Sequence, residues 1–209
     1  MAAPTVGVLA LQGDFEAHSK ILTALGAIPR EVRVPADLDG IDALVIPGGE
    51  STVMTLGIER EGLGEPLREL ATAGTPILGT CAGMIMLAER VVDGTADQET
   101  LGGLDITVRR NAFGRQVDSF EADLEIDGIA GEPVHAVFIR APWVHETGPE
   151  VRVLADVDGH PVAVRQGNVV AISFHPELSG ERRLHELVLK LAKDARELGR
   201  SGVDDGAAD

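Results

Sequence analysis

The 209-residue chain contains no tyrosine, one tryptophan and one cysteine, and aromatic residues make up only 3% of it. Without tyrosine, no phenol group can act as an acid, base or nucleophile, and few rings are present on which nucleic-acid bases would stack. A single cysteine cannot form a disulfide within the chain. Any chemistry therefore depends on cysteine, histidine, serine, threonine, lysine or carboxylate side chains.

Positive charge is also scarce, because 18 Lys and Arg residues stand against 34 Asp and Glu, a formal net charge of -16. This excess of negative charge opposes non-specific binding to nucleic acids and to anionic membranes. No apolar run approaches the roughly 18 residues of a membrane-spanning helix, and the first residues do not have the pattern of a secretory signal. These absences predict a cytoplasmic protein that binds neither nucleic acid nor membrane.

The first half of the chain alternates short apolar segments with segments of helical periodicity. Repeated strand and helix order predicts an α/β fold, a doubly wound and mostly parallel sheet flanked by helices. The predicted strands cover residues 5–11, 30–34, 43–47 and 76–79, and the predicted helices cover 15–25, a region ending near 73, and 81–91.

The second half is rich in predicted strands joined by short turns, including a hairpin at Asp158-Gly159. We expect these strands to be antiparallel additions to the parallel sheet and not a second domain. An amphipathic helix is predicted from Arg182 to a stop at Gly199, and the acidic segment 200–209 is predicted to be disordered. A single domain over residues 1–199 follows.

The only cysteine, Cys81, lies in the segment Gly79-Thr80-Cys81-Ala82-Gly83, where a predicted strand meets a predicted helix. This is the spacing of a nucleophile elbow, a sharp turn that presents the side chain at the carboxyl end of a sheet. The N–H groups at the start of a helix also stabilise a thiolate. The alternative is a buried cysteine that only packs, but packing requires neither glycine, so the spacing favours a nucleophile.

A thiol nucleophile needs a base, and one histidine is well placed among His18, His135, His145, His160, His175 and His185. His175 follows a predicted strand, and Pro176 favours an extended backbone there, so Glu177 at i+2 can face the same side and orient the ring. Cys81, His175 and Glu177 then form a triad. The alternative is a His–Glu pair that only stabilises the end of a strand. No spacing indicates a metal site, and no cofactor is expected.

Gly48 and Gly49 follow another predicted strand of the parallel sheet. Their backbone N–H groups are candidates for an oxyanion hole, which stabilises the tetrahedral intermediate of acyl transfer. The alternative is a plain turn before a helix capped by Ser51.

The three segments PGGES (47–51), LGTCAGM (78–84) and FHPE (174–177), in this order, resemble the class I, triad-type glutamine amidotransferases. Longer segments narrow the resemblance to the family of glutaminase subunits of pyridoxal 5'-phosphate synthase. These segments are GVLALQGD (7–14), RNAFGRQVDSFEADL (110–124), VFIRAP (137–142) and SFHPEL (173–178). The resemblance extends over residues 6–191.

The resemblance implies a flavodoxin-like fold and hydrolysis of L-glutamine to glutamate and ammonia. It also implies that the ammonia passes to a separate, barrel-shaped synthase subunit that makes pyridoxal 5'-phosphate. Cys81 would be the nucleophile, His175 the general base and acid, and Glu177 the residue that orients His175. The residues implied to bind glutamine are Gly48, Gly49, Glu50, Arg110, Ile139 and Arg140.

Three other functions stay open at this point. The first is an amidotransferase subunit for another acceptor such as imidazole glycerol phosphate. The second is a cysteine hydrolase or peptidase of similar fold, and the third is a non-catalytic scaffold. The resemblance of residues 110–124 disfavours another acceptor. The His-Pro-Glu segment near the C-terminus disfavours a peptidase, and the intact triad disfavours a scaffold. Surface ion pairing is the alternative role for Arg110 and Arg140.

Overall fold

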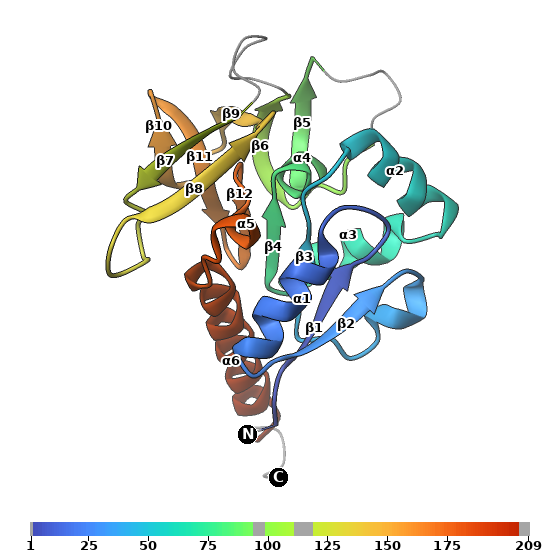
Figure 1. Cartoon of the computed structure of the whole chain (residues 1–209). Coiled ribbons are helices and arrows are strands. Elements are labelled where there is room, and N and C mark those ends of the chain that lie inside the picture. The colour runs from blue at the N-terminus through green and yellow to red at the C-terminus, as the bar shows by residue number, and fades with distance from the viewer. Residues whose placement is uncertain (1, 94–98, 111–118, 205–209) are drawn as a thin grey trace.

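The computed structural model describes residues 2–93, 99–110 and 119–204 (Figure 1). Residues 111–118, which belong to the segment 110–124 that contributes to the family resemblance, lie outside the described residues. The last part of the predicted acidic tail, 205–209, does so as well.

A seven-stranded sheet forms the centre of the fold, in the strand order β10-β11-β12-β4-β3-β1-β2. All neighbours from β12 to β2 pair in parallel, whereas β10, β11 and β12 pair antiparallel. The predicted α/β fold, mostly parallel with antiparallel strands from the second half, is therefore confirmed. The strands are β1 (Thr5–Leu9), β2 (Ile28–Val32), β3 (Ala43–Ile46), β4 (Ile77–Thr80), β10 (Arg152–Val157), β11 (His160–Gln166) and β12 (Val169–Ile172).

Helices cover both faces of this sheet, because successive strand residues point to opposite sides and both sides are apolar. In β3, for example, Ala43 and Val45 belong to one hydrophobic core and Leu44 and Ile46 to the other. The first core packs against α1 and α6, the second against α2, α3 and α4 (Figure 1). These helices are α1 (Phe15–Ala24), α2 (Ser51–Arg60), α3 (Gly64–Thr72), α4 (Ala82–Leu87) and α6 (Arg183–Asp204).

Two smaller sheets and two short helices complete the described fold. Phe138 of β8 is fully buried, and its ring stacks on Phe120 of β7 with centroids 4.4 Å apart. It also meets the ring of Phe174 edge-on at 5.6 Å, which ties β7 and β8 to the segment that leads into His175. The elements are β5 (Ala88–Val92), β6 (Leu104–Arg109), β9 (Trp143–Thr147), β7 (Ser119–Leu124), β8 (Val134–Ile139), η1 (Pro35–Leu38) and α5 (Pro176–Ser179).

Several predicted element boundaries are wrong. The strand expected at residues 30–34 lies at Ile28–Val32, two residues earlier. The helix expected over 81–91 ends at Leu87, because the following residues form β5 and pair with β6. The helix expected to stop at Gly199 continues to Asp204, since a glycine inside a helix costs only about 1 kcal/mol. The hairpin at Asp158-Gly159 is confirmed, and it joins β10 to β11.

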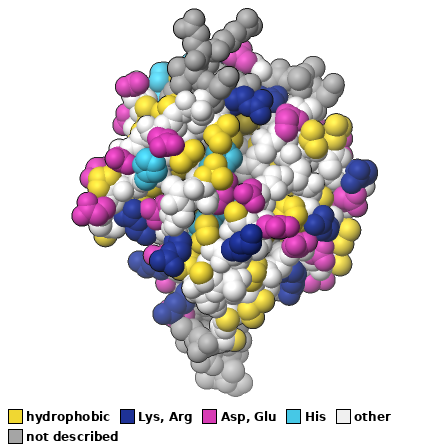
Figure 2. Space-filling view, viewed as in Figure 1, with side chains coloured by type: hydrophobic (Ala, Val, Ile, Leu, Met, Phe, Trp, Pro, Cys, Tyr) yellow, Lys and Arg dark blue, Asp and Glu magenta, His cyan; other side chains and the backbone are white. Residues whose placement is uncertain are grey.

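The surface carries charges of both signs. Figure 2 shows acidic and basic side chains interspersed over one face of the molecule. None of the helices in the described ranges is long and apolar enough to cross a membrane.

We predict that Phe138→Ala lowers the free energy of unfolding by about 3–5 kcal/mol, because it removes a buried ring that contacts two other rings. Phe138→Leu, which keeps most of the buried volume, should lose clearly less. Urea denaturation of both variants measures this difference. Equal stability of Phe138→Ala and the wild type would show that this aromatic contact does not hold β7 and β8 on the core.

Candidate active site

Cys81 occupies the sharp turn between β4 and α4. Its φ of 49° and ψ of -103° lie outside the regions that residues with a side chain normally adopt. The backbone packs closely here, since a Cβ at Gly79 would lie 2.8 Å from the Gly83 carbonyl carbon and a Cβ at Gly83 would lie 2.2 Å from the Ile46 oxygen. The N–H of Cys81 donates to the Ile172 oxygen of β12 at 2.8 Å. The segment thus has the backbone geometry of a nucleophile elbow.

His175 and Glu177 form a buried pair at the end of the neighbouring strand β12. Nδ1 of His175 lies 2.7 Å from Oε1 of Glu177. The Glu177 side chain is 1% exposed and the His175 side chain 14% exposed, so water screens this interaction weakly. The structure therefore places His175 and Glu177 in the contact that the sequence predicts.

The surroundings of His175 favour its charged form. Burial alone lowers the pKa of His175, but its contacts with Cys81 and Glu177 outweigh burial and raise the pKa to about 10. Burial raises the pKa of Glu177, whereas the bond from His175 and the nearby His18 bring it below its usual value. An imidazolium held by a carboxylate is therefore available beside Cys81, ready to donate a proton.

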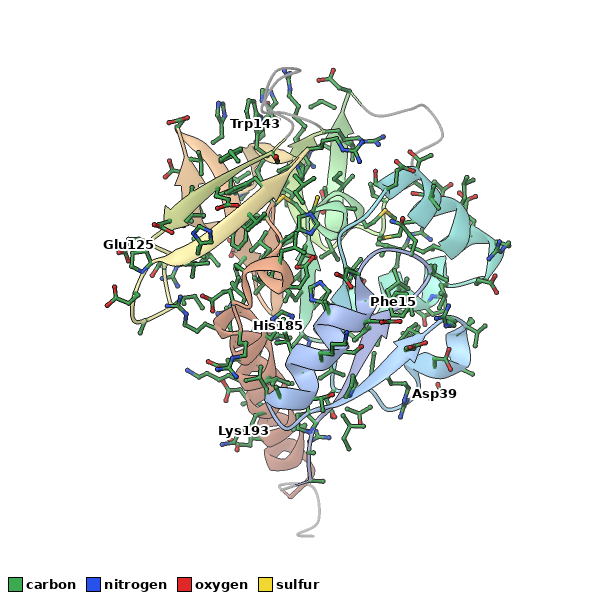
Figure 3. The ribbon with its side chains drawn as sticks, viewed as in Figure 1. Phe15, Asp39, Glu125, Trp143, His185 and Lys193 are labelled. Carbon is green, nitrogen blue, oxygen red and sulfur yellow. The ribbon has the colours of Figure 1, made fainter. Side chains whose placement is uncertain are left out.

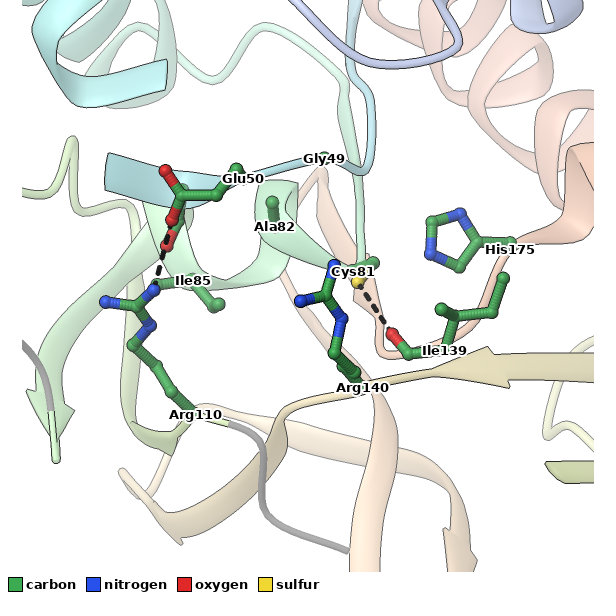
Figure 4. A pocket seen from close by; sticks show the side chains of 10 residues that line it. Gly49, Glu50, Cys81, Ala82, Ile85, Arg110, Ile139, Arg140 and His175 are labelled. Carbon is green, nitrogen blue, oxygen red and sulfur yellow. Dashed lines mark hydrogen bonds and ion pairs between the residues drawn. The ribbon is translucent and has the colours of Figure 1, made fainter. Parts of the chain in front are cut away.

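A cavity of about 190 Å³ opens beside Cys81 and His175 (Figure 4). Gly48 is not part of its wall, but it contacts the His175 ring so closely that a Cβ there would lie 2.4 Å from Cε1. Within the described ranges, no group of three or more His, Cys, Asp or Glu residues is placed to hold a metal ion. The cavity is lined by Gly49, Glu50, Ser51, Cys81, Ala82, Ile85, Arg110, Ile139, Arg140 and His175.

Glu50 and Arg110 provide opposite charges on one wall of the cavity, 3.3 Å apart. The Glu50 carboxylate accepts from the N–H groups of Thr52 and Val53 at 3.1 and 2.7 Å, so Glu50, and not Ser51, caps α2. Burial raises the pKa of Glu50, but these backbone donors and Arg110 outweigh it and lower the pKa. The wall therefore presents a fixed carboxylate.

Ile139, the last residue of β8, and Arg140, which follows it, form another part of the wall. Arg140 has a φ of 44°, in the left-handed region that favours glycine, and such strain often accompanies a functional site. The Cys81 sulfur lies 3.9 Å from the Ile139 oxygen (Figure 4). The end of β8 thus contributes to the cavity both a contact with the thiol and a guanidinium group.

The loop that contains Gly48 and Gly49 is braced by residues that the sequence analysis did not single out for this role. Nε2 of Gln12 donates to the backbone carbonyl oxygen of Glu50 at 2.9 Å. At Gly13, a Cβ would lie 2.0 Å from the Gly48 oxygen, so only glycine fits. Gly49 itself has a φ of 149°. The segment after β1 therefore sets the path of this loop.

His18 is a second residue near the site that sequence reasoning missed. It lies on the buried side of α1, with Nε2 3.5 Å from Oε2 of Glu177. Its distance along the sequence gives no signal of this contact, which arises from the packing of α1 against α5.

The sequence of the chain is similar to the sequences of known proteins. The model of the SNO glutamine amidotransferase family matches residues 8–193. Several similar proteins, two of which are described here, carry the name pyridoxal 5'-phosphate synthase subunit PdxT. The one from Frankia alni is 56% identical over 195 residues, which cover 93% of this chain and 98% of that protein. The one from Mycolicibacterium vanbaalenii is 59% identical over 190 residues, which cover 90% of this chain and 97% of that protein.

Solved structures show the same fold. A crystal structure of a glutamine amidotransferase matches with a TM-score of 0.84 and 49% identity, covering 90% of this chain and 98% of that one. A glutamine amidotransferase from Thermotoga maritima matches with a TM-score of 0.58 over 95% of this chain and 93% of that one. At 14% identity, the second match shows a likeness of fold alone.

We predict that Glu177→Gln lowers the pKa of His175, because burial then opposes the imidazolium without a carboxylate to offset it. A histidine whose pKa is higher in the folded protein than in the unfolded chain stabilises the fold when it is protonated. For His175, this contribution is complete below the unfolded pKa of about 6.5 and is lost as the pH rises towards about 10. The free energy of unfolding should therefore fall over this pH range in the wild type and fall less in Glu177→Gln.

Imidazole NMR titrations measure the pKa of His175, and denaturation at several pH values measures the stability. Glu181→Gln is a matched control, because Glu181 bonds Arg183 and not His175. An unchanged pKa of His175 in Glu177→Gln would contradict the role given to the carboxylate.

Proposed function

The chain belongs to the SNO glutamine amidotransferase family, and we propose that Cys81, His175 and Glu177 form the triad with which it hydrolyses L-glutamine. As a glutaminase subunit, it supplies ammonia for pyridoxal 5'-phosphate synthesis. The observation that carries the proposed triad is the strained turn of Cys81 beside the buried His175–Glu177 pair, at one cavity.

In the first half of the proposed reaction, the Cys81 thiolate attacks the carbonyl carbon of the glutamine side-chain amide. The negative oxygen of the tetrahedral intermediate accepts from N–H groups of the Gly48–Gly49 loop. Nδ1 of His175 is held by Glu177, so Nε2 of His175 gives its proton to the amide nitrogen. The C–N bond breaks, ammonia leaves, and a thioester remains on Cys81.

In the second half, neutral His175 takes a proton from a water molecule, and the resulting hydroxide attacks the thioester carbon. The C–S bond breaks, glutamate leaves and the Cys81 thiolate returns. His175 is again an imidazolium held by Glu177, ready for the next glutamine.

The charged walls of the cavity suit a free amino acid. We propose that Arg110 and Arg140 hold the α-carboxylate of glutamine, since a guanidinium binds a carboxylate well. The negative charge of the Glu50 carboxylate attracts the α-ammonium group of glutamine. Gly49 and Ile139 line the cavity and supply backbone and apolar contacts along the substrate. Gly48 lies just outside the wall, against the His175 ring, and takes part through the backbone of its loop. This arrangement supports glutamine over a peptide, whose α groups are not charged.

Ammonia is used only if a partner receives it, and the similar proteins are named as subunits of pyridoxal 5'-phosphate synthase. The chain is accordingly a subunit of such a complex, and we propose that its partner is the barrel-shaped synthase subunit. Ile139 and Leu178, 39% and 50% exposed, offer apolar contacts near the cavity and next to Glu177. A cytoplasmic location and a single domain over residues 1–199 stay predictions.

The test is glutamate release from L-glutamine, with and without the purified synthase subunit. We expect release by the wild type that the synthase subunit stimulates. Cys81→Ala and Cys81→Ser should lower it by about 10³-fold or more, because the residual rate of a triad enzyme without its nucleophile is very small.

The serine variant controls for packing, because it nearly preserves the side-chain volume. Release by Cys81→Ala at the wild-type rate would contradict the proposed nucleophile. No release by the wild type, even with the synthase subunit, would favour a non-catalytic scaffold.

A further inference from the structure

Two histidines lie buried behind the proposed triad, outside the cavity. His18 on α1 and His185 on α6 are both 0% exposed. Nδ1 of His18 lies 2.9 Å from Nε2 of His185, within hydrogen-bond distance. Figure 3 shows His185 on α6, on the side that faces α1. Neither ring lines the cavity, so their pairing is not explained by contact with a substrate.

The histidine pair continues to Glu177. Nε2 of His18 lies 3.5 Å from Oε2 of Glu177, too close for a water molecule between them. Among the described residues, neither atom has a hydrogen-bond partner, although both are buried. Because Oε1 of Glu177 is bonded to His175, the Oε2 atom is left for His18. The four side chains therefore form a continuous chain of polar contacts from α6 to Cys81.

The contacts select one tautomer of each ring. If Nε2 of His18 carries the proton, it points a donor at the Glu177 carboxylate, and Nδ1 accepts from Nε2–H of His185. Only an acceptor, Nδ1 of His185, then stays unpaired. In the reverse arrangement, Nδ1 of His18 carries the proton and the lone pair of Nε2 faces the carboxylate. Nδ1–H of His185 is then a buried donor without an acceptor, which is rarer and costs more than a buried acceptor without a donor.

We propose that His18 is a positioning residue of the glutaminase reaction: its Nε2–H holds Oε2 of Glu177, so that Oε1 stays on Nδ1 of His175. This inference rests on the proposed function, since Glu177 orients His175 only within that triad. His185 supports the arrangement by donating to Nδ1 of His18 and so fixing its tautomer.

Both histidines are neutral in the middle of the pH range. Burial lowers the pKa of His18, and burial together with His18 lowers the pKa of His185 to about 3. A neutral donor leaves the whole negative charge of the carboxylate to the imidazolium of His175, whereas a charged His18 would compete for it. The titratable groups that face the two rings are Asp14, His175, Glu177 and Glu181.

The consequence of losing the donor is specific. A buried carboxylate oxygen without a partner disfavours the charged form of Glu177 and frees it to rotate. The imidazolium of His175 is then less stable, so the pKa of His175 falls and its proton is less available to the leaving ammonia. This predicts an effect on catalysis and on its pH dependence, and little effect on the binding of glutamine.

The experiment compares His18→Asn with His18→Gln, measured with the synthase subunit present. The amide nitrogen of Gln reaches about as far as Nε2 of histidine, whereas that of Asn stops near Nδ1. For His18→Asn we expect kcat to fall on the order of 10-fold, a part of what general acid–base catalysis contributes, with KM nearly unchanged. The alkaline limb of kcat/KM should move to lower pH. His18→Gln should keep kcat, and the pH of the alkaline limb of kcat/KM, near the wild-type values.

His135→Asn is the matched control, because His135 is an exposed histidine that also bonds two carboxylates, on β7. It should leave kcat and the pH profile unchanged. Wild-type values for His18→Asn, or equal losses in His18→Asn and His18→Gln, would overturn the inference, because the donor would then not matter. An inactive wild type would instead contradict the proposed function.

A measurement on the wild type does not depend on the folding of any variant. The imidazole ¹⁵N chemical shifts should show His18 protonated at Nε2 and not at Nδ1 at neutral pH. A ring protonated at Nδ1 alone, or at both nitrogens, would overturn the inference.

Discussion

The buried contact between His175 and Glu177 is the constraint on which the site depends. A charged pair out of water is stable only when its remaining polar atoms also find partners. The fold meets this demand with three elements. The segment after β12 carries His175, α5 carries Glu177, and α1 places His18 at the second oxygen of Glu177. The helices on this face of the sheet therefore do more than cover the core, since they hold the carboxylate in place.

The order of the strands explains why residues far apart in the sequence converge. Strand β4 lies between β3 and β12, and all three run in parallel, so their carboxyl ends meet at one edge of the sheet. The loop with Gly48 follows β3, Cys81 follows β4, and His175 follows β12. Gly48 touches the His175 ring and approaches Cys81, so the absence of a side chain there is required by this convergence.

Local patterns predicted much of this arrangement. The glycines beside Cys81 indicated the turn, and the i+2 spacing indicated the contact of His175 with Glu177. Contacts between distant segments could not be predicted in this way. The contact of His18 with Glu177, for example, depends on how α1 packs. The cap of α2 is local, but Ser51 is of a residue type that usually caps helices and glutamate is not, so the sequence pointed to the wrong neighbour. The early end of α4 depends on the pairing of β5 with β6, which no local helical pattern reveals.

The proposed reaction depends on a covalent step at Cys81. The most direct measurement is mass spectrometry of the enzyme, with the synthase subunit, after acid quenching during turnover of L-glutamine. We predict a glutamyl adduct confined to the peptide that contains Cys81, present in the wild type and lost when glutamine is consumed. Turnover without any adduct, or an adduct on another residue, would contradict the proposed mechanism.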